Sequence, residues 1–119
     1  SFISLKHIIP NLFNILADNG KAVCLIKPQF EAGKDKIGKN GIIKDISVHK
    51  DVVLDIYNLV KEHGFSVIGI DFSPIKGPKG NIEYLIYIQK GYFEYVFDNN
   101  IIGEIVLKSH AELNRGESI

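Results

Sequence analysis

Five apolar residues in a row, from Ala22 to Ile26, end abruptly at Lys27 and Pro28. A short apolar run bounded by turn residues is typical of a strand covered on both faces, as in a parallel α/β sheet. Pro28 cannot donate a hydrogen bond to a neighbouring strand, so the chain is expected to leave the sheet there. Lys27 would therefore stand at the carboxyl end of the strand, the edge at which α/β sheets bind ligands.

Helical patterns surround this strand. A turn over residues 5–9 is expected to lead into a helix that begins at Pro10 and stops at Asn19-Gly20, because proline suits a first helical turn. Residues 28–44 form a long polar loop, and loops of this length are often functional. Asp45 can cap a helix that runs to His63, with Gly64 as its stop and an apolar face between Val52 and Val60.

The second half of the chain contains further strand patterns. We predict strands over 65–72 and 82–89, a short extra strand over 92–97, and a final helix over 101–113. A helix between the first two strands makes those strands parallel. The link 73–81 contains no helix, so the third strand should return antiparallel. If it lies beside the first strand, Glu83 and Lys27 meet at one sheet edge.

Bulk properties exclude several classes of protein. The chain has 119 residues, enough for one compact domain. Its 14 basic and 14 acidic residues cancel, so net charge predicts neither a nucleic-acid partner nor an anionic membrane surface. Cys24 is the only cysteine, which excludes an internal disulfide and favours a reducing cytoplasm. No apolar run approaches the roughly 20 residues of a membrane-spanning helix.

Two groupings of charged residues could carry chemistry. Lys27 and Glu83 form a candidate acid/base pair, although a lysine acts as a base only if its pKa falls, and a structural ion pair is the alternative. The second grouping could form the local positive patch that a phosphate backbone requires, or be ordinary solvated loop charge. It comprises Lys34, Lys36, Lys76 and Lys79.

Other motifs point to no site. Gly33–Asn40 nearly matches a phosphate-binding P-loop, but Asn40 replaces the hydroxyl residue and Gly41 follows where a helix should begin. A flexible polar loop is the simpler interpretation. Cys24 is expected to pack in the core. The histidines have no metal-ligand spacing, and we expect no metal site at His7, His49, His63 or His110.

Several longer strings resemble a known family, the TlyA (hemolysin A-like) ribosomal RNA 2′-O-methyltransferases, which carry an FtsJ-type, Rossmann-like catalytic domain. The resemblance covers nearly the whole chain. It is carried by Ser1–Leu5 (SFISL), Ile26–Gly33 (IKPQFEAG), Ser73–Glu83 (SPIKGPKGNIE) and Val106–His110 (VLKSH).

The resemblance implies a catalytic role for two residues. Lys27 matches the second lysine of the family's Lys-Asp-Lys-Glu tetrad, and Glu83 matches its glutamate. The remaining tetrad residues, the S-adenosylmethionine loop and an S4-type RNA-binding domain would lie upstream. Residues 1–119 would then be the C-terminal half of the methyltransferase domain, with parallel strands, one antiparallel strand and flanking helices.

The resemblance also implies a function. The full-length protein would transfer a methyl group from S-adenosylmethionine to a ribose 2′-hydroxyl in ribosomal RNA in the cytoplasm. The two loops at the catalytic edge, residues 28–44 and 73–81, would flank the RNA nucleotide. The 2′-hydroxyl of that nucleotide distinguishes RNA from DNA. The substrate-binding candidates in these loops are Gln29, Glu31, Lys34, Ser73, Lys76 and Asn81.

This chain alone is expected to bind no cofactor and to be inactive. The alternative is a non-catalytic RNA- or protein-binding module derived from the same fold. Without an upstream half, the sheet should retain exposed apolar surface and an unpaired strand edge. We therefore expect a homo-oligomer or a swapped dimer, and no membrane association.

Overall fold

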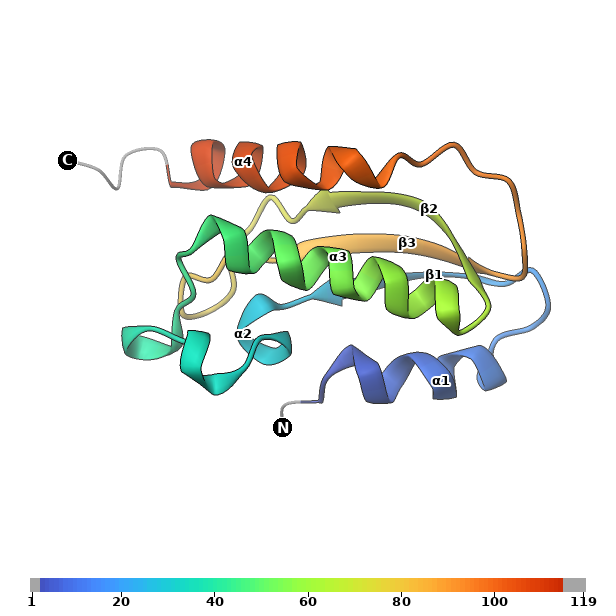
Figure 1. Cartoon of the computed structure of the whole chain (residues 1–119). Coiled ribbons are helices and arrows are strands. Elements are labelled where there is room, and N and C mark those ends of the chain that lie inside the picture. Colours follow the sequence, from blue (N-terminus) through green and yellow to red (C-terminus); the bar gives the residue numbers. More distant parts are fainter. Residues whose placement is uncertain (1–2, 115–119) are drawn as a thin grey trace.

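The computed structural model describes residues 3–114, which form a small antiparallel sheet with helices (Figure 1). The elements follow in the order α1 (Leu5–Ile15), β1 (Lys21–Ile26), α2 (Pro28–Glu31), η1 (Lys34–Lys36), η2 (Lys39–Gly41), α3 (Ile46–Glu62), β2 (Phe65–Phe72), β3 (Tyr84–Lys90), η3 (Asn99–Ile101) and α4 (Ile102–Leu113).

The three strands are arranged in the order β1-β3-β2, and β3 runs antiparallel to both neighbours. β1 and β2 therefore point in the same direction without being paired to each other. The predicted directions of all three strands are confirmed, and β3 does lie beside β1. Ile26 pairs with Tyr84 at the end of the β1–β3 ladder, which fixes the edge where β1 ends and β3 begins.

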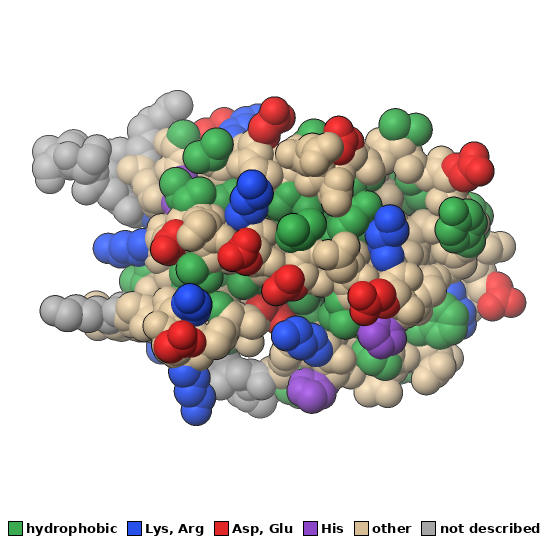
Figure 2. Space-filling view, in the orientation of Figure 1, with side chains coloured by type: hydrophobic (Ala, Val, Ile, Leu, Met, Phe, Trp, Pro, Cys, Tyr) green, Lys and Arg blue, Asp and Glu red, His purple; other side chains and the backbone are tan. Residues whose placement is uncertain are grey.

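The helices build the core on one side of this sheet. α3 contacts β2, β3, α4 and α1, and Figure 1 shows it lying across the front of the sheet with α4 above and α1 below. Burying a large aliphatic side chain contributes roughly 1.5–3 kcal/mol, so this layer dominates stability. Among its fully buried residues are Ile26, Val53, Ile56, Val60, Ile86 and Ile88. The outer surface of the helices carries charges of both signs, interspersed (Figure 2).

β1 is covered on one face only, so the prediction that both faces are covered is wrong for the described residues. Cys24 and Ile26 are buried, whereas Val23 is 60% and Leu25 39% exposed. On the neighbouring strand, Tyr87 pairs with Val23 and is also 38% exposed. The continuous apolar run fits a two-sided strand, but no described helix packs on the second face.

α1 is one continuous helix, which corrects the expected turn followed by a helix starting at Pro10. The Ser4 hydroxyl accepts a hydrogen bond from the backbone N–H of Lys6 and caps the helix there. Pro10 lies inside the helix, where it removes one backbone hydrogen bond. Burial of Leu5 and Ile9 holds the turn that precedes the proline.

α3 begins and ends as predicted. The Asp45 carboxylate accepts a hydrogen bond from the Ser47 N–H at 2.8 Å, and Gly64 follows the helix with φ +90°. A Cβ atom at Gly64 would stand 2.6 Å from the ring of Phe13. Glycine is therefore required both by the left-handed backbone and by the close approach of α1.

Two other loop predictions change. The segment 28–44 is not uniformly irregular, because α2 and two single 3₁₀ turns lie within it. Its P-loop-like glycines, Gly33 and Gly38, flank these turns, so the strand–loop–helix geometry of a P-loop is not formed. The segment 92–97 is not a strand: the Ser66 hydroxyl takes the hydrogen bond of the Phe93 N–H and donates to the Gly91 carbonyl. β3 begins at Tyr84, two residues later than predicted.

Candidate active site

Lys27 and Glu83 lie at one edge of the sheet, as the strand directions predicted. Lys27 directly follows the last residue of β1, and Glu83 directly precedes β3, so both lie just beyond the Ile26–Tyr84 pair at the same end of the ladder. The ammonium of Lys27 lies 5.1 Å from the centre of the Phe30 ring, in a cation–π contact. An ammonium group and a carboxylate therefore belong to adjacent strands at this edge.

Glu83 is buried, with 5% of its surface exposed. Its Oε2 accepts a hydrogen bond from Gln29 Nε2 at 3.0 Å. A buried carboxylate requires such partners, because removing it from water without them is costly. Gly77 provides the space: a Cβ atom there would lie 2.5 Å from Oε2. The carboxylate is therefore held between α2 and the loop 73–83.

Gln29 links the two sides of the site and retains one unused acceptor. Its Nε2 bonds Glu83, but its Oε1 is buried and has no hydrogen-bond partner among the described residues. A buried acceptor left in this way costs about 1–3 kcal/mol. A hydroxyl or ammonium donor entering the site would remove that cost.

Two of the predicted substrate-binding residues have structural contacts. Both oxygens of Glu31 accept hydrogen bonds at the start of α1, from the Ser4 hydroxyl at 2.6 Å and from the Leu5 N–H at 2.8 Å. Asn81 is 2% exposed and joins two loops: it accepts from the Ile43 N–H at 3.0 Å and donates to the Gly41 carbonyl at 2.9 Å. A substrate contact by Glu31 or Asn81 stays a prediction.

The remaining predicted residues are distributed along the same edge. The Ser73 N–H donates to the Glu83 carbonyl at 2.8 Å, which ties the loop to the start of β3. Lys34 lies in η1 and its side chain is exposed. Lys76 lines a neighbouring pocket.

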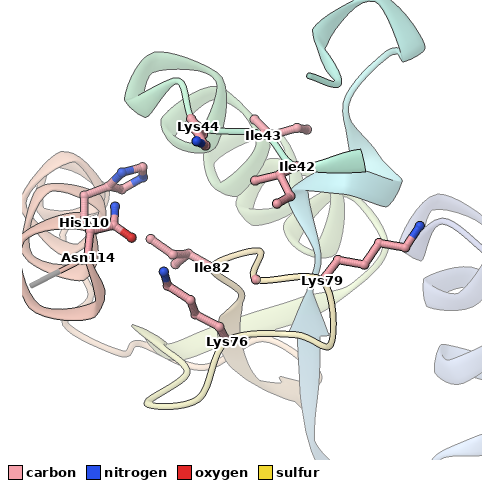
Figure 3. Close-up of a pocket in the computed structure, with 9 residues that line it drawn as sticks. Ile42, Ile43, Lys44, Lys76, Lys79, Ile82, His110 and Asn114 are labelled. Atoms are coloured by element: carbon pink, nitrogen blue, oxygen red, sulfur yellow. The ribbon is translucent and has the colours of Figure 1, made fainter. Parts of the chain in front are cut away.

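This pocket of about 420 Å³ opens between the two loops and α4 (Figure 3). Figure 3 shows Lys44, Lys76, His110 and Asn114 directed toward a common space, while the Lys79 side chain extends away along the loop. The lining residues combine cationic, amide and aliphatic groups. They are Ile42, Ile43, Lys44, Lys76, Lys79, Gly80, Ile82, His110 and Asn114.

Comparison with known proteins places this fold and edge in a family. The family model described as "FtsJ-like methyltransferase" matches residues 1–90, which contain Lys27, Glu83 and the whole sheet. The chain belongs to the FtsJ-like methyltransferase family.

Two relatives of this FtsJ-like chain are named as ribosomal RNA methyltransferases. It is 43% identical over 88 residues to the "Putative rRNA methyltransferase YqxC" of Bacillus subtilis, covering 74% of this chain and 31% of that protein. It is 36% identical over 89 residues to the "16S/23S rRNA (cytidine-2'-O)-methyltransferase TlyA" of Mycobacterium tuberculosis, covering 75% and 33%. The chain thus spans about a third of the length of the curated relatives it matches.

A solved structure extends the likeness to the whole chain. The "Putative hemolysin from Streptococcus thermophilus" superposes with a TM-score of 0.91 at 44% identity, covering 100% of this chain and 43% of that one. The likeness includes α4, which lies beyond the FtsJ-like match. Within the described residues, no helix is long and apolar enough to cross a membrane.

Sequence reasoning missed a buried polar network behind the pocket of this FtsJ-like chain. His49 Nδ1 lies 2.9 Å from the Tyr84 hydroxyl and 3.0 Å from His110 Nε2. The Tyr84 hydroxyl lies 2.9 Å from Ser109 Oγ. His49 lies on the apolar face of α3, four residues before Val53. A polar residue on an apolar helix face indicates a buried hydrogen-bonding group, and this was the one sign of the network in the sequence. Its partners are 35 and 61 residues away, so only tertiary packing reveals them.

Burial sets the protonation of this network. It lowers the pKa of His49 to about 4, with the neighbouring His110 acting in the same direction. Burial, and then the charge of Lys76, also lower the pKa of His110. Burial raises the pKa of Tyr84 to about 12. At neutral pH the three groups are therefore uncharged.

The described residues form no metal centre. No cluster of three His, Cys, Asp or Glu side chains suited to a metal ion occurs among residues 3–114. Cys24 is buried as predicted, and burial raises the pKa of its thiol, which disfavours the reactive thiolate.

Proposed function

We propose that this chain is part of an S-adenosylmethionine-dependent methyltransferase that modifies a ribose 2′-hydroxyl of ribosomal RNA in the cytoplasm. The observation that carries the proposal is the placement of Lys27 and Glu83 at one sheet edge, on adjacent antiparallel strands. Membership of the FtsJ-like family and the printed names of the relatives support it.

In this proposal Lys27 acts on the nucleophile. Its amine would accept the proton of the ribose 2′-hydroxyl, or would orient that hydroxyl for attack. A positioned base contributes about 10²–10⁴-fold in rate. Glu83, fixed by Gln29, supplies the negative charge beside Lys27, and the unpaired Oε1 of Gln29 is a ready acceptor for a hydroxyl or ammonium donor.

S-adenosylmethionine would supply the methyl group. The described residues do not fit a binding site for it, because their glycine-containing segment 33–41 forms 3₁₀ turns rather than a loop between a strand and a helix. We therefore assign cofactor binding to residues outside this chain. We propose that residues 1–119 are the C-terminal half of the methyltransferase domain and are inactive alone.

The test uses a chimera in which residues 1–90 replace the matching segment of the Bacillus subtilis relative. Transfer of a labelled methyl group to ribosomal RNA is expected for the chimera. Lys27→Ala should lower kcat by about 10²-fold or more. Lys21→Ala, at the opposite end of β1, is the matched control and should leave kcat unchanged.

Two outcomes would contradict the proposal. Unchanged turnover of Lys27→Ala would remove Lys27 from the mechanism. A folded chimera that binds RNA without methylating it would favour a non-catalytic RNA-binding module built on the same fold.

A further inference from the structure

The candidate active site holds a hydrogen-bond acceptor without a donor, next to a donor group without an acceptor. The acceptor is Gln29 Oε1, which is buried and has no hydrogen-bond partner among the described residues. The donor group is the ammonium of Lys27. Within residues 3–114 it contacts the Phe30 ring, 5.1 Å from the ring centre, and makes no hydrogen bond or ion pair. Buried polar groups are rarely left unpaired in folded proteins, and one rearrangement would pair both residues.

The orientation of the Gln29 amide follows from its contact with Glu83. A carboxylate can only accept hydrogen bonds, so the group that meets Glu83 Oε2 at 3.0 Å is the amide nitrogen. The carboxylate itself is buried, and Gly77 packs against the same oxygen. The amide is therefore held in one orientation, in which its oxygen points away from Glu83 as a fixed acceptor.

The backbone holds Lys27 and Gln29 in a constant relation to each other. Lys27 is the last extended residue before α2, and its carbonyl accepts from the N–H groups of Phe30 at 2.9 Å and Glu31 at 3.1 Å. Pro28 lies between them, buried, with a φ angle that its ring restricts. The Glu31 carboxylate ties α2 to the start of α1. A change of partner by Lys27 therefore involves rotation of its side chain and no movement of α2.

A neighbouring side chain suits Gln29 Oε1 better than a bound nucleotide does. Because the atom is buried, a ribose cannot contact it while the amide stays on Glu83. The Lys27 side chain begins two residues earlier at the same sheet edge, and lysine carries several N–H donors on a flexible stem. A hydrogen bond from this nitrogen to a buried acceptor is stronger than its contact with the face of a phenylalanine ring.

We propose that Gln29 is a positioning residue for Lys27. When the ribose occupies the site, the Lys27 nitrogen leaves the Phe30 ring and donates one N–H to Gln29 Oε1. This hydrogen bond leaves the lone pair of the neutral amine free, and the proton of the 2′-hydroxyl moves to that nitrogen. Glu83 acts through Gln29 in this arrangement, because it fixes the amide. The inference rests on the proposed function.

The experiment compares two glutamine variants in the chimera described above. Gln29→Met removes the amide and keeps the length of the side chain. It should lower kcat for methyl transfer by about tenfold or more and leave KM for RNA unchanged, because it misplaces Lys27 without touching the RNA. Gln89→Met is the matched control. Its amide donates to the Asn19 carbonyl at the opposite end of β1 and β3, so kcat should stay unchanged.

A double-mutant cycle tests whether Gln29 acts through Lys27. In the Lys27→Ala background, Gln29→Met should cause no further loss of kcat, because the group that it positions is already absent. The melting temperature of each variant is measured alongside. A merely structural role would lower the melting temperature, and its effect on kcat would add to that of Lys27→Ala.

Three results would overturn the inference: unchanged kcat in Gln29→Met, a further loss when it is combined with Lys27→Ala, or a raised KM for RNA at unchanged kcat. The last result would assign the amide to a contact with RNA. Failure of the proposed function is read separately, from an inactive chimera or from unchanged turnover of Lys27→Ala, and it would remove this inference as well. Normal turnover of Gln29→Met beside an impaired Lys27→Ala contradicts only the role of Gln29.

Discussion

At the scale of single residues, the residues around Glu83 fix the position of its carboxylate. It is 5% exposed, accepts a hydrogen bond from Gln29, and contacts a glycine where any other side chain would collide. These contacts fix the carboxylate in one place. The function proposed for Lys27 depends on that place, because misplacing a catalytic group by about 1 Å can cost 10²-fold in rate.

Gly77→Ala tests this dependence. The added Cβ would stand 2.5 Å from Glu83 Oε2, the atom that accepts from Gln29, so the carboxylate must shift. In the chimera described above, kcat should fall by about 10²-fold while the melting temperature changes little, because the displaced atom ends a side chain. Gly69→Ala is the matched control, since a Cβ there meets nothing within 4 Å. Equal kcat values for the two variants would contradict a positioning role for Glu83.

At the scale of elements, the His49 network joins α3, β3 and α4. The Ile43 carbonyl can only accept, so His49 Nε2 is the donor at 2.9 Å. In the neutral ring Nδ1 is then an acceptor, and it faces the Tyr84 hydroxyl and His110 Nε2. Asp45, at the start of α3, is the acidic group that favours the charged form of this ring. Protonation of His49 Nδ1 would remove this acceptor from the network.

Stability should therefore depend on pH. The pKa of His49 is about 4 in the folded chain, against 6.5 as its ordinary value, so the unfolded chain binds the proton first. This contribution is fully present above about pH 6.5 and is lost as the pH falls toward 4, by up to about 3 kcal/mol. Urea unfolding at about pH 7 and pH 4.5 measures it.

The matched variants for that measurement are His49→Gln and His7→Gln. The first should flatten the pH dependence of the unfolding free energy, whereas the second, at an exposed position on α1, should preserve it. An unchanged pH dependence in His49→Gln would assign the effect to other groups, such as His110.

At the scale of the whole molecule, the sheet is covered on one side. β1 pairs with β3 along one edge and has no described partner along the other. Val23 and Leu25 project from its open face, 60% and 39% exposed. An unpaired edge strand with apolar side chains is a site for pairing with another chain.

We expect the 119-residue chain to self-associate through this strand. Sedimentation velocity should show an average mass that rises with concentration. Val23→Lys places a charge on the open face of this edge strand and should shift the chain toward monomer. Leu107→Lys, on α4, changes a side chain of similar exposure, 57%, and should have no such effect. A monomer at high concentration would contradict the expectation.

Much of this architecture follows from local patterns. The cap at Asp45, the stop at Gly64 and the apolar spacing between them predicted α3, and the apolar run ending at Lys27-Pro28 predicted β1. The helix-free link before Glu83 predicted the direction of β3 and so the meeting of Lys27 and Glu83 at one edge. Each of these signals lies within the element or connection that it describes.

Other features depend on contacts between distant segments. Pro10 falls within α1 because Ser4 and the buried Leu5 hold the first turn. The contact of His49 with His110 joins residues 61 positions apart. No local sequence pattern predicts the contact between His49 and His110, because each side chain is compatible with several environments before the chain is packed.

The sequence by itself determined β1, β2, α3 and the directions of the three strands, because backbone propensity and connection length act locally. The tertiary structure decided that β3 lies beside β1, which brings Lys27 and Glu83 to one edge. Only the tertiary structure decided which face of β1 is covered, how Gln29 and Gly77 hold the Glu83 carboxylate, and that lysines from two loops line one pocket with residues of α4. Those outcomes depend on long-range packing and on hydrogen-bond partners that only the folded chain brings within reach.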